Sequence, residues 1–167
     1  MNSLDEKDEI AFILKRLKNT FGEPPDVFKV MLESKELLSS ADYMRESLSV
    51  LDLSPIEREL LIYFFSFLND SQFCIDIHHE LLVMHGFNYS KVAEEKEFFN
   101  IKDSKLVELL KFSKAIYLSQ GHATEEEKKS FLDAGYTTKN QLEVLLIFSF
   151  SHCVNSVSRF FNLKSYT

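Results

Sequence analysis

The chain has 167 residues, 45% of them hydrophobic, and a formal net charge of −7. This length suits one domain, so we expect a single domain over residues 1–167. An acidic chain without a Lys/Arg-rich run offers no patch for nucleic acid. No stretch approaches the ~20 apolar residues that span a bilayer, so we expect no membrane-spanning segment and no membrane partner. Only 4 Gly and 3 Pro are present, which argues against a fold of many strands and turns.

The cysteines and the N-terminus bear on the compartment. Cys74 and Cys153 are the two cysteines, too few for a disulfide framework. The opening MNSLDEKDEI is acidic and lacks the apolar run of a signal peptide. We therefore expect a cytoplasmic protein with reduced thiols.

The first part of the chain has the pattern of three helices. Residues 4–20 carry apolar side chains near one face, and Gly22 closes this segment. Pro24-Pro25 begins a second helix, since proline suits the first helical turn. A third helix is expected over residues 35–49.

The clearest helix start follows at Ser54. Pro55 stands at the first helical position, and Glu57 completes a capping box with the serine. The segment LLIYFFSFL that comes next is apolar almost all round, which predicts a central helix. Asn69 or Asp70 is the expected cap of the helix after it.

The C-terminal part also has the pattern of helices. One is expected over residues 103–120, and Thr124 with Glu127 forms the capping box of another. Thr138 and Gln141 open the last and longest helix, which runs to about residue 162. Left-handed glycines are expected after three of the helices, at Gly86, Gly121 and Gly135. Strand-type alternation is missing, so the predicted fold is all-α with seven or eight helices.

The helix after Asn69 carries one stripe of side chains at helical spacing. The stripe consists of Cys74, Ile77, His78, Leu81 and Leu82, and Ser71 extends it back by one turn. His78 therefore faces the same side as Cys74, while His79 does not. A helix start favours a thiolate and the imidazole can accept its proton, so we expect a Cys74 pKa below about 8.5. The alternative is a core helix whose cysteine is simply a small buried hydrophobe.

Glu59 lies at the start of an apolar run, where a carboxylate is costly unless it has a partner. If the helices before and after Asn69 form an antiparallel hairpin, Glu59 lies ~15 Å from the turn and His78 ~13.5 Å from it, at ~1.5 Å per residue. The two side chains then lie side by side and suit a proton relay. The alternative is that Glu59 is a solvated first-turn acid like Glu57.

These residues carry a family resemblance. SPIERELLIYFFSFLNDSQFCIDIHH resembles the signature of the carboxymuconolactone decarboxylase and alkyl hydroperoxidase D-like superfamily, in which Arg-Glu-Leu precedes a Cys-x-x-Cys motif and a histidine. The matching positions are Arg58, Glu59, Leu60, Asn69, Phe73, Cys74 and His78, within a signature region at about 54–86. EPPDVFKVMLES is similar to the peroxidase-related branch, and Asn155 and Arg159 match the closing helix of the family.

The resemblance implies a helical bundle built around a central antiparallel helix hairpin, and a thiol-dependent antioxidant activity of the alkyl hydroperoxidase and peroxiredoxin kind. It makes Glu59 and His78 the proton relay and Cys74 the reacting thiol. Ser71 stands where the family has its first cysteine, so no disulfide can form between positions 71 and 74. A single-cysteine route remains, in which Cys74 becomes a sulfenic acid that an external thiol or Cys153 resolves.

Two other functions stay open: a cysteine-independent enzyme of the decarboxylase type, and a degenerate, non-catalytic homologue. The apolar composition and the resemblance both predict a homo-oligomer, from dimer to hexamer. The expected partners are a small hydroperoxide or other small molecule and a thiol reductant protein. We expect no cofactor, because no Gly-rich phosphate loop is present. We also expect no metal site, although Cys74, His78, Glu59 and His152 are conceivable ligands.

Overall fold

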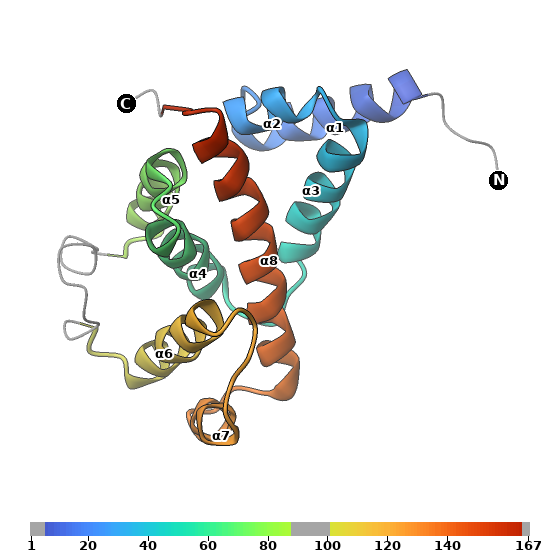
Figure 1. The fold of residues 1–167 in the computed structure, drawn as a ribbon. Helices are drawn as coiled ribbons and strands as arrows, with labels where there is room; N and C mark the ends of the chain where they lie inside the picture. Colours follow the sequence, from blue (N-terminus) through green and yellow to red (C-terminus); the bar gives the residue numbers. More distant parts are fainter. Residues whose placement is uncertain (1–5, 88–100, 165–167) are drawn as a thin grey trace.

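The computed structural model describes residues 6–87 and 101–164, and all regular structure within these ranges is α-helical. The eight helices are α1 (Glu6–Phe21), α2 (Asp26–Met31), α3 (Lys35–Leu48), α4 (Pro55–Leu68), α5 (Gln72–Met84), α6 (Ser104–Leu118), α7 (Glu125–Asp133) and α8 (Thr138–Phe160). The all-α prediction is therefore confirmed. The long helix α8 runs through the middle of the molecule, with α1–α3 on one side and α4–α7 on the other (Figure 1).

Helices α4 and α5 form the antiparallel hairpin that the family resemblance implies, and α4 also packs against α6 and α8. The turn between them is only three residues long. Asn69 is the C-cap of α4, Asp70 takes a left-handed φ of 54°, and the Ser71 N–H donates to the Ser66 carbonyl at 3.0 Å. Aspartate tolerates this conformation better than most residues. The turn thus sets the register of the two helices.

The expected cap of α5 at Asn69 or Asp70 is wrong, because both residues are used to end α4. Ser71 is the N-cap instead, and its side chain makes no capping bond. The capping box of α8 also begins one residue earlier than predicted: Thr137 pairs with Asn140, at 3.2 and 3.0 Å. By contrast, the box at Ser54 has the predicted residues.

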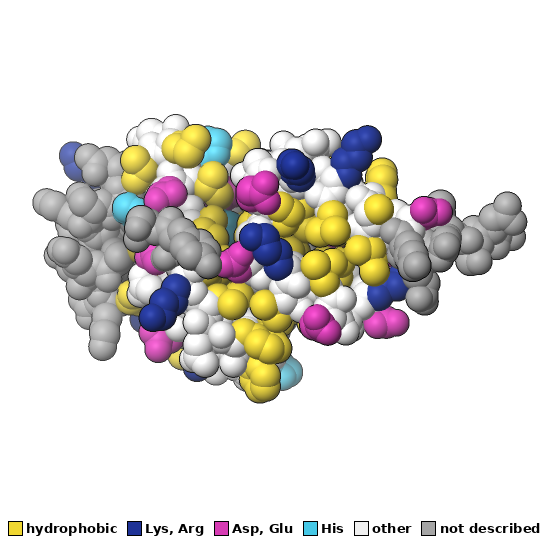
Figure 2. Space-filling model, turned by 90° about the horizontal axis from the view of Figure 1, so that it is seen from above, with side chains coloured by type: hydrophobic (Ala, Val, Ile, Leu, Met, Phe, Trp, Pro, Cys, Tyr) yellow, Lys and Arg dark blue, Asp and Glu magenta, His cyan; other side chains and the backbone are white. Residues whose placement is uncertain are grey.

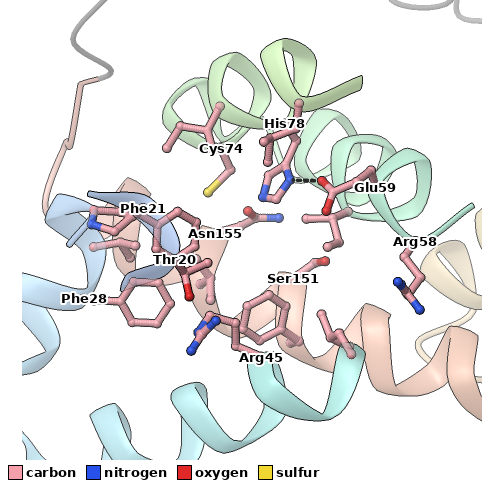
Figure 3. Close-up of a pocket in the computed structure, with 18 of the residues that line it drawn as sticks. Thr20, Phe21, Phe28, Arg45, Arg58, Glu59, Cys74, His78, Ser151 and Asn155 are labelled. Carbon is pink, nitrogen blue, oxygen red and sulfur yellow. Dashed lines mark hydrogen bonds and ion pairs between the residues drawn. The ribbon is translucent and has the colours of Figure 1, made fainter. Parts of the chain in front are cut away.

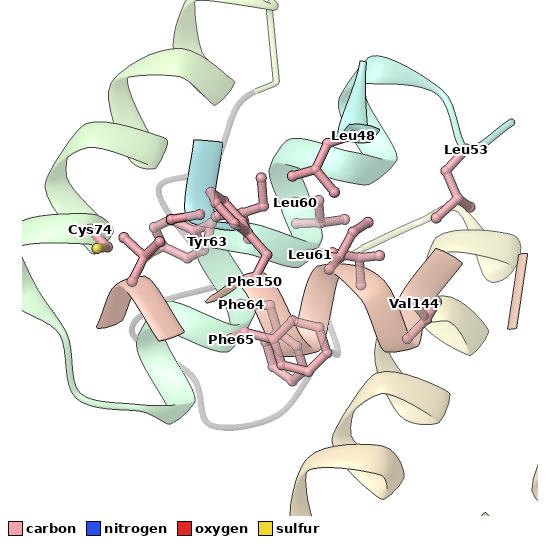
Figure 4. Close-up of a cluster of buried hydrophobic side chains, with 14 of the residues drawn as sticks. Leu48, Leu53, Leu60, Leu61, Tyr63, Phe64, Phe65, Cys74, Val144 and Phe150 are labelled. Atoms are coloured by element: carbon pink, nitrogen blue, oxygen red, sulfur yellow. The ribbon is translucent and has the colours of Figure 1, made fainter. Parts of the chain in front are cut away.

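All eight helices contribute to the hydrophobic core, and Figure 4 shows the part of it where α4 meets α5, α8 and the end of α3. Leu60, Leu61 and Phe65 on α4 are fully buried, as are Val144 and Ile147 on α8. Full burial of one such side chain stabilises the fold by about 1.5–3 kcal/mol. The prediction that α4 is central is confirmed.

Within the described residues, none of the helices has the length and apolar character needed to cross a membrane. Figure 2 shows one face of the molecule, on which hydrophobic side chains gather near the centre with charged side chains among and around them. Exposed aromatic residues occur at Phe12, Tyr43, Phe160 and Phe161. Apolar surface of this kind is compatible with the predicted self-association but does not identify an interface.

Candidate functional site

Glu59 and His78 meet across the α4–α5 hairpin. The His78 Nδ1 atom lies 2.8 Å from Glu59 Oε2, and both side chains are about one-fifth exposed. The predicted adjacency is therefore confirmed. A carboxylate oxygen only accepts hydrogen bonds, so Nδ1 carries the hydrogen, and in the neutral imidazole Nε2 is then an acceptor. In Figure 3 this second nitrogen points away from Glu59 toward Asn155.

Cys74 is the third residue of α5, and its side chain is buried, with 4% of its surface exposed. Burial raises the pKa of the thiol, and hydrogen bonds from Ser71 and Ser158 offset this only in part. The expectation of a lowered pKa is therefore wrong. The physical reason is that loss of water around the sulfur disfavours the charged thiolate, and the sequence alone does not show how deeply the thiol is buried. At rest Cys74 is a neutral thiol.

Ser71 is also buried and lies beside Cys74, as the helical stripe predicts. Its Oγ is 2.7 Å from Ser158 Oγ, and the Cys74 Sγ is 3.8 Å from the same oxygen. The Ser158 hydroxyl donates to the Asn155 carbonyl at 3.0 Å. In this arrangement the Ser158 oxygen accepts from Ser71 and from the thiol. The two serine hydroxyls lower the pKa of Cys74 by less than burial raises it.

A cavity of about 350 Å³ brings the predicted residues together (Figure 3). Its walls come from α1–α5 and α8, and most of them are apolar. The polar lining residues are Thr20, Arg45, Ser49, Arg58, Glu59, Cys74, His78, Ser151 and Asn155. Mostly apolar walls with a few convergent polar groups are typical of small-molecule sites. Glu59, Cys74 and His78 all line this cavity, whereas Ser71 lies behind Cys74.

Two of the polar lining residues, Ser151 and Asn155, lie one turn apart on α8 and are almost completely buried. Reasoning from the residues did not single out Ser151 or Ser158, and Asn155 entered only through the family resemblance. A signal was present: Ser151, Asn155 and Ser158 follow the spacing of Val144 and Ile147, so polar residues continue an apolar stripe. Polar side chains on such a stripe are candidates for function.

Other predicted groups lie elsewhere. Cys153 is only half-buried, is not part of the lining of this cavity, and has its pKa raised by burial. Arg159 donates to the Asn69 carbonyl at 2.8 Å, and this hydrogen bond connects α8 to the turn between α4 and α5. Arg58 likewise donates to backbone, to the Leu51 and Leu53 carbonyls. His152 is exposed and lies against Phe148. Among the described residues, no cluster of three or more His, Cys, Asp or Glu could hold a metal ion.

No protein-family model and no curated protein matches this sequence. The fold does resemble solved structures. One is the crystal structure of an uncharacterized peroxidase-related protein from Silicibacter sp. TM1040, with 17% identity, a TM-score of 0.81, and coverage of 98% of this chain and 87% of that one. Another is an alkylhydroperoxidase AhpD core, an uncharacterized peroxidase-related protein from Ralstonia eutropha JMP134, with 16% identity, a TM-score of 0.80, and coverage of 96% and 88%.

The chain thus has the fold of these two peroxidase-related proteins over almost its whole length. At 16–17% identity the likeness establishes fold. The function depends on the residues that line the cavity.

Proposed function

We propose that the protein is a thiol-dependent antioxidant protein in which Cys74 reduces a small hydroperoxide. The observation that carries the proposal is that Cys74 opens on the same cavity as the hydrogen-bonded Glu59–His78 pair. The fold shared with peroxidase-related proteins supports it. Ser71 then takes the place of a first cysteine, which makes this a single-cysteine variant of the site.

The raised pKa of Cys74 defines what the relay has to do. A neutral thiol is a poor nucleophile, so a base must remove its proton as it attacks. His78 Nε2 is the acceptor that faces the cavity, and Glu59 holds the ring by its other nitrogen and stabilises the imidazolium that forms. The same division of labour between base and orienting carboxylate occurs in other nucleophilic sites.

Resolution of the oxidised cysteine needs a second thiol. Cys153 does not line the cavity, so we propose an external thiol, supplied by a reductant protein or a small molecule. Two external thiols reduce the Cys74 sulfenic acid to the thiol, with release of one disulfide and one water. Because both cysteines are free, we also propose a reducing compartment such as the cytoplasm.

The test is mass spectrometry of the purified protein after one equivalent of a small organic hydroperoxide. We expect a sulfenic acid at Cys74 and not at Cys153, and none in Cys74→Ala. Cys153→Ala serves as the matched control and keeps the reaction. Unmodified Cys74 in the native protein would refute the proposal and leave the decarboxylase-type and non-catalytic alternatives.

We further propose that the protein is a homo-oligomer, on the basis of its exposed aromatic residues. Light scattering at tens of micromolar concentration checks this. A monomer mass at that concentration would contradict it.

A further inference from the structure

Ser151 is unusual among the serines of these helices. The hydroxyls of Ser66, Ser113 and Ser149 each donate to the carbonyl four residues earlier, at 2.7–2.9 Å. The Ser151 hydroxyl is buried and has no such partner among the described residues. Instead, Ser151 lines the cavity that contains Cys74.

Asn155 has a second unpartnered group one turn further along α8. Its Oδ1 accepts from the Ser66 hydroxyl at 3.1 Å, in a hydrogen bond that shares the single Ser66 hydrogen with the Ile62 carbonyl at 2.7 Å. Its Nδ2 is buried and makes no hydrogen bond within the described part of the chain. In Figure 3 this nitrogen points to the side of the cavity where Glu59, His78 and Ser151 lie.

Buried polar groups in proteins are paired in the great majority of cases. Two that lie one turn apart, both in the wall of one cavity, indicate a polar ligand atom that both can reach. A hydroxyl and an amide N–H both donate hydrogen bonds, so the matching atom is an oxygen that carries negative charge or a lone pair. Cys74 and His78 line the same cavity, so an oxygen held there shares the cavity onto which the reacting sulfur opens.

We infer that Ser151 Oγ and Asn155 Nδ2 hold the oxygen that leaves when Cys74 attacks a hydroperoxide. This inference rests on the proposed function and adds two substrate-binding groups to it. Donors that are already fixed stabilise charge developing on an oxygen without reorganising during the reaction. Asn155 is hydrogen-bonded to Ser66, and α8 holds the buried Ser151 side chain one turn away.

The reaction is balanced as follows. The Cys74 sulfur bonds to the terminal oxygen of ROOH, the O–O bond breaks, and RO⁻ leaves toward the two donors. His78 takes the thiol proton and passes it to RO⁻, so the products are the Cys74 sulfenic acid and ROH. The sulfur is oxidised by two electrons and the peroxide is reduced by two.

The test compares two reagents that attack the same sulfur. tert-Butyl hydroperoxide has a leaving oxygen, whereas 4,4′-dithiodipyridine oxidises the thiol through a leaving group without oxygen. For Ser151→Ala and Asn155→Ala we expect the peroxide rate at Cys74 to fall at least tenfold, toward the ~10²-fold that loss of one oxyanion donor costs. The dithiodipyridine rate is expected to stay within about twofold, since a methyl group replaces the donor without blocking the sulfur.

Ser149→Ala is the matched control, because Ser149 lies on the same helix but is exposed and bonds its own helix carbonyl. It should change neither rate. Equal changes in both rates for Ser151→Ala would overturn the inference, since a structural water or a packing role would affect access to the sulfur as a whole.

Thermal melts show which variants fold. If Asn155→Ala does not fold, Ser151→Ala decides alone, because it removes one atom and no hydrogen bond of the fold. If wild-type Cys74 forms no sulfenic acid, the proposed function fails and this inference with it. If wild type reacts and both variants react equally fast, only the inference fails.

Discussion

Glu57 and Glu59 lie two residues apart at the start of α4, yet their surroundings differ. Glu57 accepts from the Ser54 N–H at 2.7 Å and from the Tyr136 hydroxyl at 2.8 Å. Glu59 faces the cavity and is hydrogen-bonded to His78. The description of Glu57 as a solvated acid is therefore wrong, because Tyr136 from the α7–α8 connection covers it. A carboxylate held by the backbone and a tyrosine supports the fold, whereas one held by a cavity-facing imidazole can take part in chemistry.

The largest expected effect concerns Glu59, the carboxylate of this pair that faces the cavity. Glu59→Gln removes the carboxylate that orients His78 and stabilises its charged form, so we expect the peroxide rate at Cys74 to fall by about 10²-fold or more. The free energy of unfolding should change by less than about 1 kcal/mol, because the pair is partly exposed. Stopped-flow kinetics and urea melts measure the two quantities. An unchanged rate would remove Glu59 from the relay.

The next prediction tests whether position 71 is equivalent to the first cysteine of the family motif or only supports the fold. Ser71→Cys places a second thiol beside Cys74 at the helix start, where the pair can adjust to disulfide geometry. We expect peroxide to remove two titratable thiols per chain, and a dithiol reductant to restore both. Turnover with that reductant should exceed wild type, and Cys74→Ala in the same background should abolish it.

Free-thiol titration and peroxide consumption give the readouts for Ser71→Cys. A folded variant that forms no intramolecular disulfide would show that position 71 is not equivalent to the first cysteine of the family motif. A variant that forms the disulfide but remains fast after Glu59→Gln would show that the geometry is right and the relay is not.

A substitution at Glu57 should affect the stability of the fold. Glu57→Ala deletes one half of the α4 capping box and leaves the buried Tyr136 hydroxyl without its acceptor. We expect a loss of about 2 kcal/mol or more in the free energy of unfolding. The peroxide rate per folded molecule should stay at the wild-type value. Urea denaturation with activity measured below the transition separates the two, and a rate loss without destabilisation would contradict the assignment.

The smallest effect concerns pH. Burial raises the pKa of Cys74, so its dithiodipyridine rate should still be rising above pH ~8.5, the ordinary thiol value. The folded state favours the neutral thiol, so this stabilisation is complete below about pH 8.5 and is lost as pH rises through the folded-state pKa. Cys74→Ala should remove that part of the pH dependence of stability. A midpoint below pH 8.5 would show that the helix start outweighs burial.

The sequence by itself determined the helices, and it placed Glu59 beside His78 on the condition that the two helices around Asn69 form a hairpin. Helix capping and helical periodicity are local properties, and the length of the turn relates the levels of two consecutive helices. The sequence could not assign Asn69 and Asp70 to the end of α4, because the same residue types begin and end helices. Only the folded turn distinguishes the two uses: the Asn69 and Asp70 N–H groups donate to the Phe65 and Phe67 carbonyls at the end of α4.

Tertiary structure alone decided the protonation of Cys74, the burial of Glu57, and the polar groups of α8 that reach the cavity. Ser158 is 84 residues from Cys74 in the chain, and Tyr136 is 79 residues from Glu57. Desolvation depends on everything that packs around a group, whereas a sequence motif records only neighbours along the chain. The motif thus identified the candidate reacting residues. The fold determined the proton affinity of Cys74 and the side chains that surround these residues.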